Sequence, residues 1–493
     1  MMHRDPRHRA TRKAARPRVG VFALVAAVAF LPAWATANPL DLYGLGARGT
    51  AMGGAMSALA SDYSALYYNV AGMAGAKSSL GIGLTLGLDD VRIRLKPRPQ
   101  GYDLADLGPG SARVPTKYRV NPRSNTDDLP DTYGFHIGAT GRLGFDELRV
   151  GIAAWLPMNA VGTQRSHFAD EREQYFANQL HFELIGERAQ QQVIVFGIAW
   201  QVNKWLSLGG GFDFLPSSRT VAQVYLDNPT DQSHVLMTVD NVQLGSLAPH
   251  VGARIEAGEA MRIAVSFRGA NHFGLDLENA VQVRGFQETD DSYPVIQHVA
   301  IAVQSTPPEY VLGAAWEGDV LQVGLDLVHI RWSEYLNHQA EPQKNWANTT
   351  SIRLGGELRS SAEQVWRAGL SWEPTPVPEQ TGRTSYVDND RVSASVGGGH
   401  QMRFFQRDVE LGWFVQLQQL LPRDTNKKRL DEQPPCGPGV DVVCDEVADN
   451  TTDPATGEPI AAYQGLQTGS PGFPGFQSYG RLIAVGFDLK WAF

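Results

Sequence analysis

The sequence predicts an all-β protein: a 14-stranded antiparallel transmembrane β-barrel with an N-terminal hatch, or plug, inside its lumen. Three observations predict this fold. The chain begins with a secretory signal, most of the remainder alternates with a period of two, and the connections between alternating segments are by turns short and long. Strands with lipid on one face and a polar lumen on the other have this period, and outer-membrane barrels have short periplasmic turns and long extracellular loops.

Residues 1–37 have the features of a secretory signal peptide. Residues 1–18 contain seven Lys or Arg and one acidic residue, the apolar run 19–31 follows, and Ala35-Thr36-Ala37 is a small-x-small cleavage site. The alternative, a membrane anchor, is disfavoured because the run is too short to span a bilayer as a helix. Removing these residues leaves 36 Lys and Arg against 51 Asp and Glu, so we expect no nucleic-acid partner.

Residues 38–77 come before the first alternating segment and are expected to form the plug. They are rich in Ala, Gly, Ser and Met, and their apolar content disfavours a flexible periplasmic tail. Residues 44–49 match G-x-G-x-x-G, the spacing of a dinucleotide-binding loop. That loop needs a preceding buried strand, and only six residues separate Gly44 from the cleavage site. We therefore interpret these glycines as positions of close packing.

Residues 78–493 contain the barrel. In the last segment every odd position from Ile483 to Phe493 is apolar, whereas the even positions are small or charged. An even number of strands leaves both chain ends in the periplasm, and loops as long as 97–130, 159–186 and 423–478 disfavour the alternative of a soluble β-sandwich or propeller. The fourteen expected strands are 78–96, 131–142, 147–158, 187–202, 204–227, 234–256, 261–285, 293–316, 321–335, 348–359, 364–376, 391–402, 407–422 and 479–493.

The loop 423–478 contains both cysteines, Cys436 and Cys444. In an exported protein this spacing favours a disulfide over two free thiols. The chain carries no hydrolase, metalloprotease or EF-hand motif and its histidines are scattered. We therefore expect no enzymatic activity, no metal and no cofactor.

Alternation also predicts which charged side chains point into the lumen. An arginine in a partly dry lumen can hold a carboxylate through two parallel hydrogen bonds. Arg268, Arg353 and Arg367, together with His136, are therefore candidate ligand contacts; the alternative is that lumenal charges pair with one another or with the plug. The remaining inward-facing candidates are Arg254, Arg262, Asp89, Asp213, Asp326, Glu357, Glu410 and Asp488.

The loop 159–186 contains an apolar stripe. Phe168, Phe176 and Leu180 fall at i, i+8 and i+12, with Tyr175 and Phe182 nearby, which predicts a surface helix. Its apolar face is a candidate extracellular groove for collecting a hydrophobic ligand. The alternative is that the stripe packs on neighbouring loops.

The stretch "ARGTAMGGAMSALASDYSALYYNVAGMAG" resembles the N-terminal hatch of the FadL family, outer-membrane transporters of long-chain fatty acids and related hydrophobic compounds. The family pattern of Asp-x-Ser/Ala followed by Asn-Pro-Ala-Gly matches this chain except that Val70 stands at the usual proline. Residues 149–158 and 367–401 and the terminal Phe493 are similar to the family too. The matching hatch residues are Asp62, Ser64, Asn69, Ala71 and Gly72.

The resemblance implies passive uptake of hydrophobic molecules across the outer membrane of a Gram-negative cell. Ligand collects in an extracellular groove, enters a pocket in the barrel, and leaves sideways at a kinked third strand after the hatch rearranges; Pro157 is a candidate marker of that kink. We expect a monomer, surrounded by lipid and lipopolysaccharide and inserted by the barrel-assembly machinery. The alternatives are a general porin for small polar solutes and a structural or adhesive barrel.

Overall fold

The computed structural model describes most of the chain that follows the expected signal peptide. The described residues are 39–96, 124–127, 131–158, 167–168, 179–180, 182, 184–185, 193–215, 218–225, 234–243, 245–284, 295–336, 342–343, 345–381, 386–404, 407–427 and 475–493. The expected signal peptide, Cys436 and Cys444 lie outside these residues. None of the described helices is long and apolar enough to cross a membrane.

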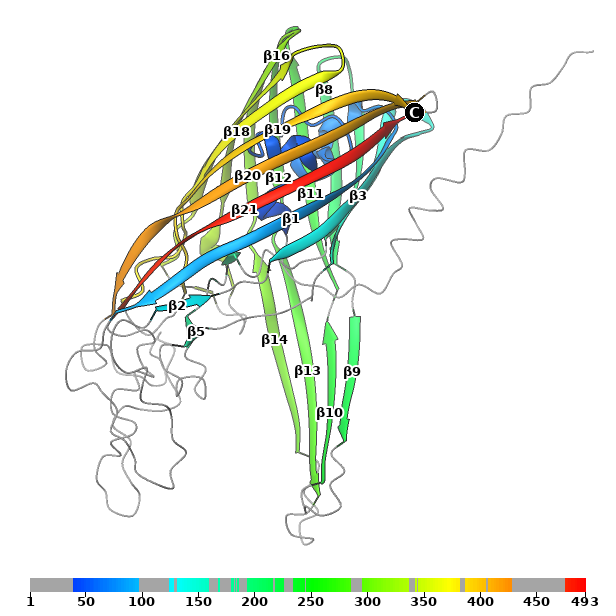
Figure 1. The fold of residues 1–493 in the computed structure, drawn as a ribbon. Helices are drawn as coiled ribbons and strands as arrows, with labels where there is room; N and C mark the ends of the chain where they lie inside the picture. Colours follow the sequence, from blue (N-terminus) through cyan, green and yellow to red (C-terminus); the bar gives the residue numbers. More distant parts are fainter. Residues whose placement is uncertain are drawn as a thin grey trace, which may run out of the picture. The chain divides into compact units, whose positions relative to one another are not determined.

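Fourteen antiparallel strands form a closed ring, as predicted, because β1 pairs with both β21 and β3 (Figure 1). The order around the ring follows the chain, so each strand pairs with its sequence neighbours within the ring. The strands are β1 (Ser79–Leu95), β3 (Thr132–Leu143), β4 (Phe145–Pro157), β7 (Val193–Gln201), β8 (Leu206–Leu215), β11 (Ser246–Ala257), β12 (Met261–Arg268), β15 (Glu309–Glu317), β16 (Leu321–Ile330), β17 (Thr349–Arg359), β18 (Gln364–Glu373), β19 (Arg391–Phe404), β20 (Arg407–Asn426) and β21 (Gly475–Ala492).

Four of the expected strands are each broken into two. Their outer halves, β9 (Ser218–Tyr225), β10 (His234–Gln243), β13 (Asn271–Arg284) and β14 (Val295–Thr306), form a separate four-stranded sheet in the order β14-β13-β10-β9. Two residues separate each from its partner in the ring, and between β14 and β15 these are Pro307 and Pro308. Proline has no N–H to donate to a ladder, so the pairing stops there. Short strands β2 (Ser124–Asp127), β5 (His167–Phe168) and β6 (Gln179–Leu180) lie in the long connections.

Residues 39–77, here called the lumenal segment, lie inside the ring (Figure 1). They form three short helices, α2 (Pro39–Tyr43), α3 (Gly46–Ala51) and α4 (Ala65–Tyr68), and the 3-10 turn η1 (Val70–Gly75). Most of the segment is buried, with Leu45, Met52, Met56, Leu66 and Met73 fully so. None of these helices is long enough to be stable alone, so packing against the barrel stabilises them.

Inward-facing glycines make room for the lumenal segment. On twelve of the fourteen strands, a methyl group on one glycine would come within 3.1 Å of the segment. At Gly369 it would overlap the backbone of Gly53, and at Gly209 the backbone of Ala71. Backbone therefore packs directly on backbone. The twelve are Gly81, Gly138, Gly151, Gly197, Gly209, Gly252, Gly313, Gly324, Gly355, Gly369, Gly397 and Gly412.

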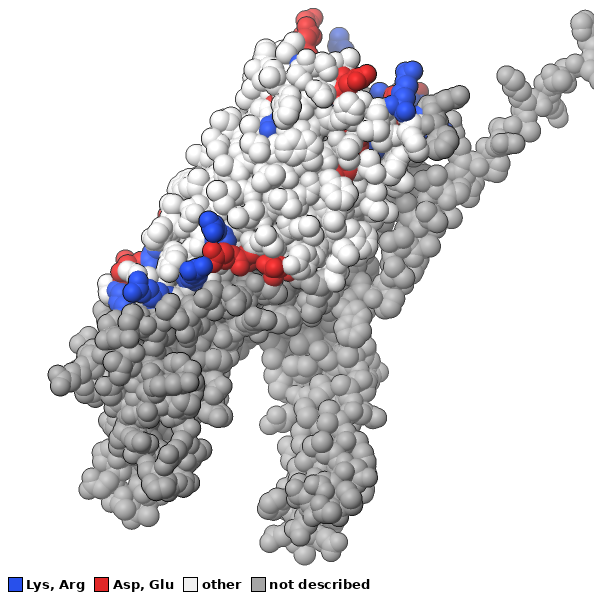
Figure 2. Space-filling model, in the orientation of Figure 1, with Lys and Arg blue, Asp and Glu red and all other residues white. Residues whose placement is uncertain are grey.

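The outer face of the barrel is apolar. On the side shown in Figure 2 the middle of the wall carries almost no charge, and Lys, Arg, Asp and Glu gather toward its two ends. Exposed aromatic side chains, including Trp200, Trp205 and Trp316, lie near the short turns, and Trp366 packs edge-on against Trp413 at 6.2 Å. Such aromatic girdles mark the boundary between lipid and water.

Candidate functional site

The lumenal segment and the barrel wall are joined by a continuous chain of ion pairs. Six charges of alternating sign follow one another, and both ends of the chain belong to the lumenal segment. The contacts are Asp62–Lys490 (3.0 Å), Lys490–Glu410 (3.0 Å), Glu410–Arg367 (2.7 Å), Arg367–Glu357 (2.7 Å) and Glu357–Arg48 (2.8 Å). We call this chain the ionic loop. Because it contains three positive and three negative groups, it is neutral as a whole.

Two barrel carboxylates hold backbone N–H groups of the lumenal segment. Asp326 of β16 accepts hydrogen bonds from the Met56 and Ser57 N–H groups at 3.0 and 2.9 Å and from the Ser57 hydroxyl at 2.5 Å. Asp488 of β21 accepts the Ala47 N–H at 2.8 Å, at the start of α3. Both side chains satisfy donors that would otherwise be buried without partners.

A second set of polar contacts holds the beginning of the segment, toward the long-loop end of the barrel. Arg268 donates to Asp41 at 3.0 Å and to the Tyr67 carbonyl at 2.7 Å, and its guanidinium lies 4.3 Å from the centre of the Tyr67 ring. The Tyr43 hydroxyl donates to Asp89 at 2.9 Å. The segment is therefore anchored at two levels of the lumen.

The predicted hatch motif residues build the turns of the lumenal segment. Asp62 accepts hydrogen bonds from the Ser64 N–H (2.9 Å) and hydroxyl (2.6 Å), at the start of α4. Asn69 accepts the Ala71 N–H at 3.1 Å and donates to the Ser57 and Ala253 carbonyls, both at 3.1 Å. A side chain at Gly72 would overlap the Ala60 carbonyl oxygen. Within G-x-G-x-x-G, Gly44 and Gly46 have φ of +87° and +79°, which suits glycine.

The four predicted ligand contacts differ in what they already bind. Arg268 and Arg367 are held by the partners given above, and His136 Nε2 lies 3.1 Å from the Tyr63 hydroxyl. Arg353 is partly exposed, and among the described residues it makes no hydrogen bond or ion pair. Its chain packs on Gly54, where an added methyl would lie 3.2 Å from Arg353 Cδ. Of these four side chains, Arg353 alone has a free polar group.

The predicted helix in loop 159–186 is wrong at both of its ends. Phe168 and Leu180 lie in β5 and β6, which pair with each other, because these residues find cross-strand partners instead of local helical ones. Leu180 and Phe182 are also not an exposed groove: they are 0 % and 1 % exposed, within an apolar cluster that includes Leu42 and Tyr43. Tyr175 and Phe176 lie outside the described residues.

The wall beside Pro157 is continuous. Pro157 ends β4 and pairs in register with Gly134 of β3, and the β3–β4 pairing has a single irregularity, at Arg142/Leu143 near the short turn. Pro157 therefore marks no gap here, since a strand end tolerates a residue without an N–H. A lateral exit at this strand would require β4 to part from a neighbour.

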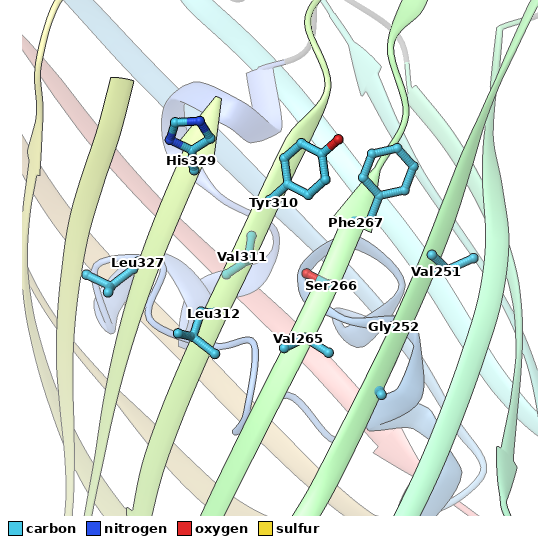
Figure 3. A pocket seen from close by; sticks show the side chains of 11 residues that line it. Val251, Gly252, Val265, Ser266, Phe267, Tyr310, Val311, Leu312, Leu327 and His329 are labelled. Carbon is cyan, nitrogen blue, oxygen red and sulfur yellow. The ribbon is translucent and has the colours of Figure 1, made fainter. Parts of the chain in front are cut away.

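A pocket of about 600 Å³ lies on the outer face of the wall and not in the lumen. It is lined by residues of β11, β12, β15 and β16. Figure 3 shows Val265, Leu312 and Leu327 in front of the strands, with the helices of the lumenal segment behind them. All three side chains are on the exposed, apolar face of the barrel, so we do not count this pocket as part of the lumenal site.

Comparison with known families decides the identity. A family described as "Outer membrane protein transport protein (OMPP1/FadL/TodX)" matches residues 25–419. The chain belongs to this family. The protein is thus an outer-membrane barrel that takes up hydrophobic compounds passively through its channel, and the FadL/TodX family is one of transporters rather than enzymes. This assignment favours uptake of hydrophobic compounds over the porin and adhesive alternatives.

Solved structures of the FadL/TodX family share the fold. A Pseudomonas aeruginosa FadL homologue is 15% identical with a TM-score of 0.53, covering 94% of this chain and 99% of the other. A TodX deltaS2S3 mutant monoaromatic hydrocarbon channel is 13% identical with a TM-score of 0.50, covering 92% and 100%. The P. putida toluene transporter TodX is 13% identical with a TM-score of 0.49, covering 92% and 99%. No curated protein matches the sequence.

Sequence reasoning missed two members of the ionic loop, Arg48 and Lys490. Lys490 stands on the even, lumenal face of the last strand, so alternation contained the signal for it. Arg48 lies between glycines in a segment without alternation. Only the fold shows that it meets Glu357.

Proposed function

We propose that this FadL/TodX family member carries hydrophobic molecules with an anionic head group, and that Arg353 receives that group. The observation that carries the proposal is the free guanidinium of Arg353 beside the lumenal segment. Asp326 stands opposite Arg353 in the β16–β17 register, but its oxygens are taken by Met56 and Ser57.

Two further groups support an anion at this place. Ser351 and Thr349 follow Arg353 along the same face of β17 toward the long loops, and both are buried. Their hydroxyls have no hydrogen-bond partner among the described residues. Hydroxyl donors next to a guanidinium are suited to a carboxylate, because hydrogen bonds to charged groups are stronger than those between neutral ones.

The transport step we propose is a rearrangement of the lumenal segment, which acts as a hatch, followed by lateral exit. Arg353 packs against Gly54 of the segment, so a head group bound there contacts the segment directly. Gly53 and Gly54, with φ of +62° and +79°, form a tight turn at this contact. We propose that the protein works as a monomer embedded in lipid and lipopolysaccharide, with Phe493 recognised during barrel assembly.

The test compares a long-chain fatty acid with its methyl ester, which has the same tail and no charge. Binding to the full chain in a non-ionic detergent is measured by calorimetry for the wild type, Arg353→Gln and Arg353→Lys. We expect Arg353→Gln to lose roughly 10- to 100-fold in affinity for the acid, with the ester unchanged and Arg353→Lys intermediate. Equal affinity of the wild type for acid and ester, or an Arg353→Gln variant that binds the acid normally, would overturn the proposal.

A further inference from the structure

Three side chains of a long loop lie inside the barrel. Leu180, Phe182 and Ile185 follow β4 in the connection to β7, and each is at most 2 % exposed. They belong to one apolar cluster, here called the upper cluster, that joins the lumenal segment to the wall. Its other large members are Leu42 and Tyr43 of the lumenal segment and Val91, Ile93, Phe414, Leu420, Phe476 and Leu482 of the wall.

The wall members of the upper cluster face the lumen. Val91 and Ile93 of β1 share a face with Gly81 and Gly87, where a side chain would overlap Tyr63 and Tyr43. Leu482 shares a face of β21 with Lys490 of the ionic loop. The loop residues therefore fill an apolar site between the long loops and the lumenal segment, on the route that a molecule entering from outside must take.

We propose that Leu180 and Phe182 occupy the site of the cargo's hydrocarbon tail and are displaced when cargo binds. This inference rests on the proposed uptake function but not on Arg353. The site would accept an alkyl or acyl chain, because its lining offers apolar side chains and its present occupants are apolar. Exchange of one apolar occupant for another buries similar surface, so entry of cargo needs no external energy.

An occupant of this site also contacts the lumenal segment. Leu42 and Tyr43 are members of the upper cluster, and each ties the segment to the wall nearby: the Leu42 carbonyl accepts from Gln418 at 2.6 Å, and the Tyr43 hydroxyl donates to Asp89. Displacement of Phe182 by a tail therefore changes the packing of the first residues of the segment. This places the exchange directly above the part of the molecule that must move.

The proposal predicts the opposite sign from an ordinary lining role. If Leu180 and Phe182 compete with cargo, removing them raises the fraction of protein ready to bind, and the apparent affinity rises with it. If they only line or support the site, the same change weakens binding. Leu184 is the matched control, because it lies in the same loop and is 5 % exposed but packs in a different cluster, with Trp332, Tyr335 and Trp346.

The experiment measures binding of a long-chain fatty acid and of its methyl ester to the wild type, a Leu180→Ala/Phe182→Ala double variant and Leu184→Ala. We expect the double variant to bind both ligands roughly tenfold more tightly or better, and Leu184→Ala to match the wild type. Thermal unfolding by circular dichroism verifies that each barrel is folded. A folded double variant with unchanged or weaker binding would overturn this inference alone, whereas a wild type that binds neither ligand would overturn the uptake function itself.

Should the double variant fail to fold, Phe182→Leu and Phe182→Trp give a second comparison. A smaller competitor is expected to strengthen binding and a larger one to weaken it. The same affinity in both, or the reverse order, would contradict competition.

Discussion

Arg48 of α3 and Glu357 of β17 form an ion pair of 2.8 Å that joins the lumenal segment to the barrel wall. Glu357 also receives Arg367, whereas Arg48 donates in addition to Gln322 at 3.0 Å. The carboxylate thus serves two cations, and the two partners are not equivalent. The predictions below follow from this and three related contacts.

Removing the carboxylate is expected to loosen the lumenal segment more than removing Arg48. Glu357→Gln leaves two buried guanidinium groups without their shared anion, whereas Arg48→Met leaves Glu357 paired with Arg367. Loss of one partner of a buried pair costs about 3–5 kcal/mol, so Glu357→Gln should lower hydrogen-exchange protection of residues 39–77 by amounts of that order. Exchange measured by mass spectrometry checks this. Equal protection in both variants and the wild type would contradict the role given to the ionic loop.

The anchor at Asp62 is expected to hold at all ordinary pH values. Burial opposes ionisation, but Lys490, the hydrogen bonds from Ser64 and Arg48 outweigh it and lower the pKa of Asp62 to about 2. A lowered pKa gives stability that is present above the unfolded value near 4 and is lost as pH falls toward 2. The difference in unfolding temperature between wild type and Asp62→Asn should therefore be constant from pH 8 to 5 and shrink from pH 4 to 2. A difference that shrinks near neutral pH would refute this assignment.

Neighbouring glycines of β17 are expected to differ sharply in tolerance. A methyl group at Gly355 would overlap the Met52 carbonyl oxygen, whereas at Gly356 the nearest atom would lie 3.9 Å away. Gly355→Ala should cost about 1–3 kcal/mol through overpacking, while Gly356→Ala should be near neutral. Thermal unfolding of the two variants tests the difference. Similar unfolding temperatures would show that the segment yields easily at this contact.

Proline at position 70 is expected to be tolerated and mildly stabilising. Val70 is the first residue of η1, and Asn69 before it is extended, with φ −166° and ψ 109°. Both conditions suit proline, so Val70→Pro should add about 0.4–1 kcal/mol by restricting the unfolded chain. Ala71→Pro is the contrasting variant, because it removes the N–H that Asn69 accepts. Exchange protection of residues 69–75 should rise in the first and fall in the second; the opposite order would contradict this view of the turn.

Much of the architecture was readable because it depends on local pattern. Alternation predicted fourteen strands, and it placed Asp89, Asp326, Glu357, Glu410 and Asp488 on the face where the structure finds them bound to the lumenal segment or its ionic loop. A strand residue's face follows from its parity alone, so a single sequence is sufficient. The four broken strands escaped prediction because apolar residues continue on both sides of each break.

By itself, the sequence determined the barrel, its plug-like first segment and the set of charges that point inward, since period and composition are properties of the chain. Only the tertiary structure decided which of those charges is left free, because the pairing of Arg268 and Arg367 depends on which strands and helices meet in space. It likewise decided that Leu180 and Phe182 lie inside the barrel, since apolar residues in a loop bury themselves wherever the fold leaves an apolar site.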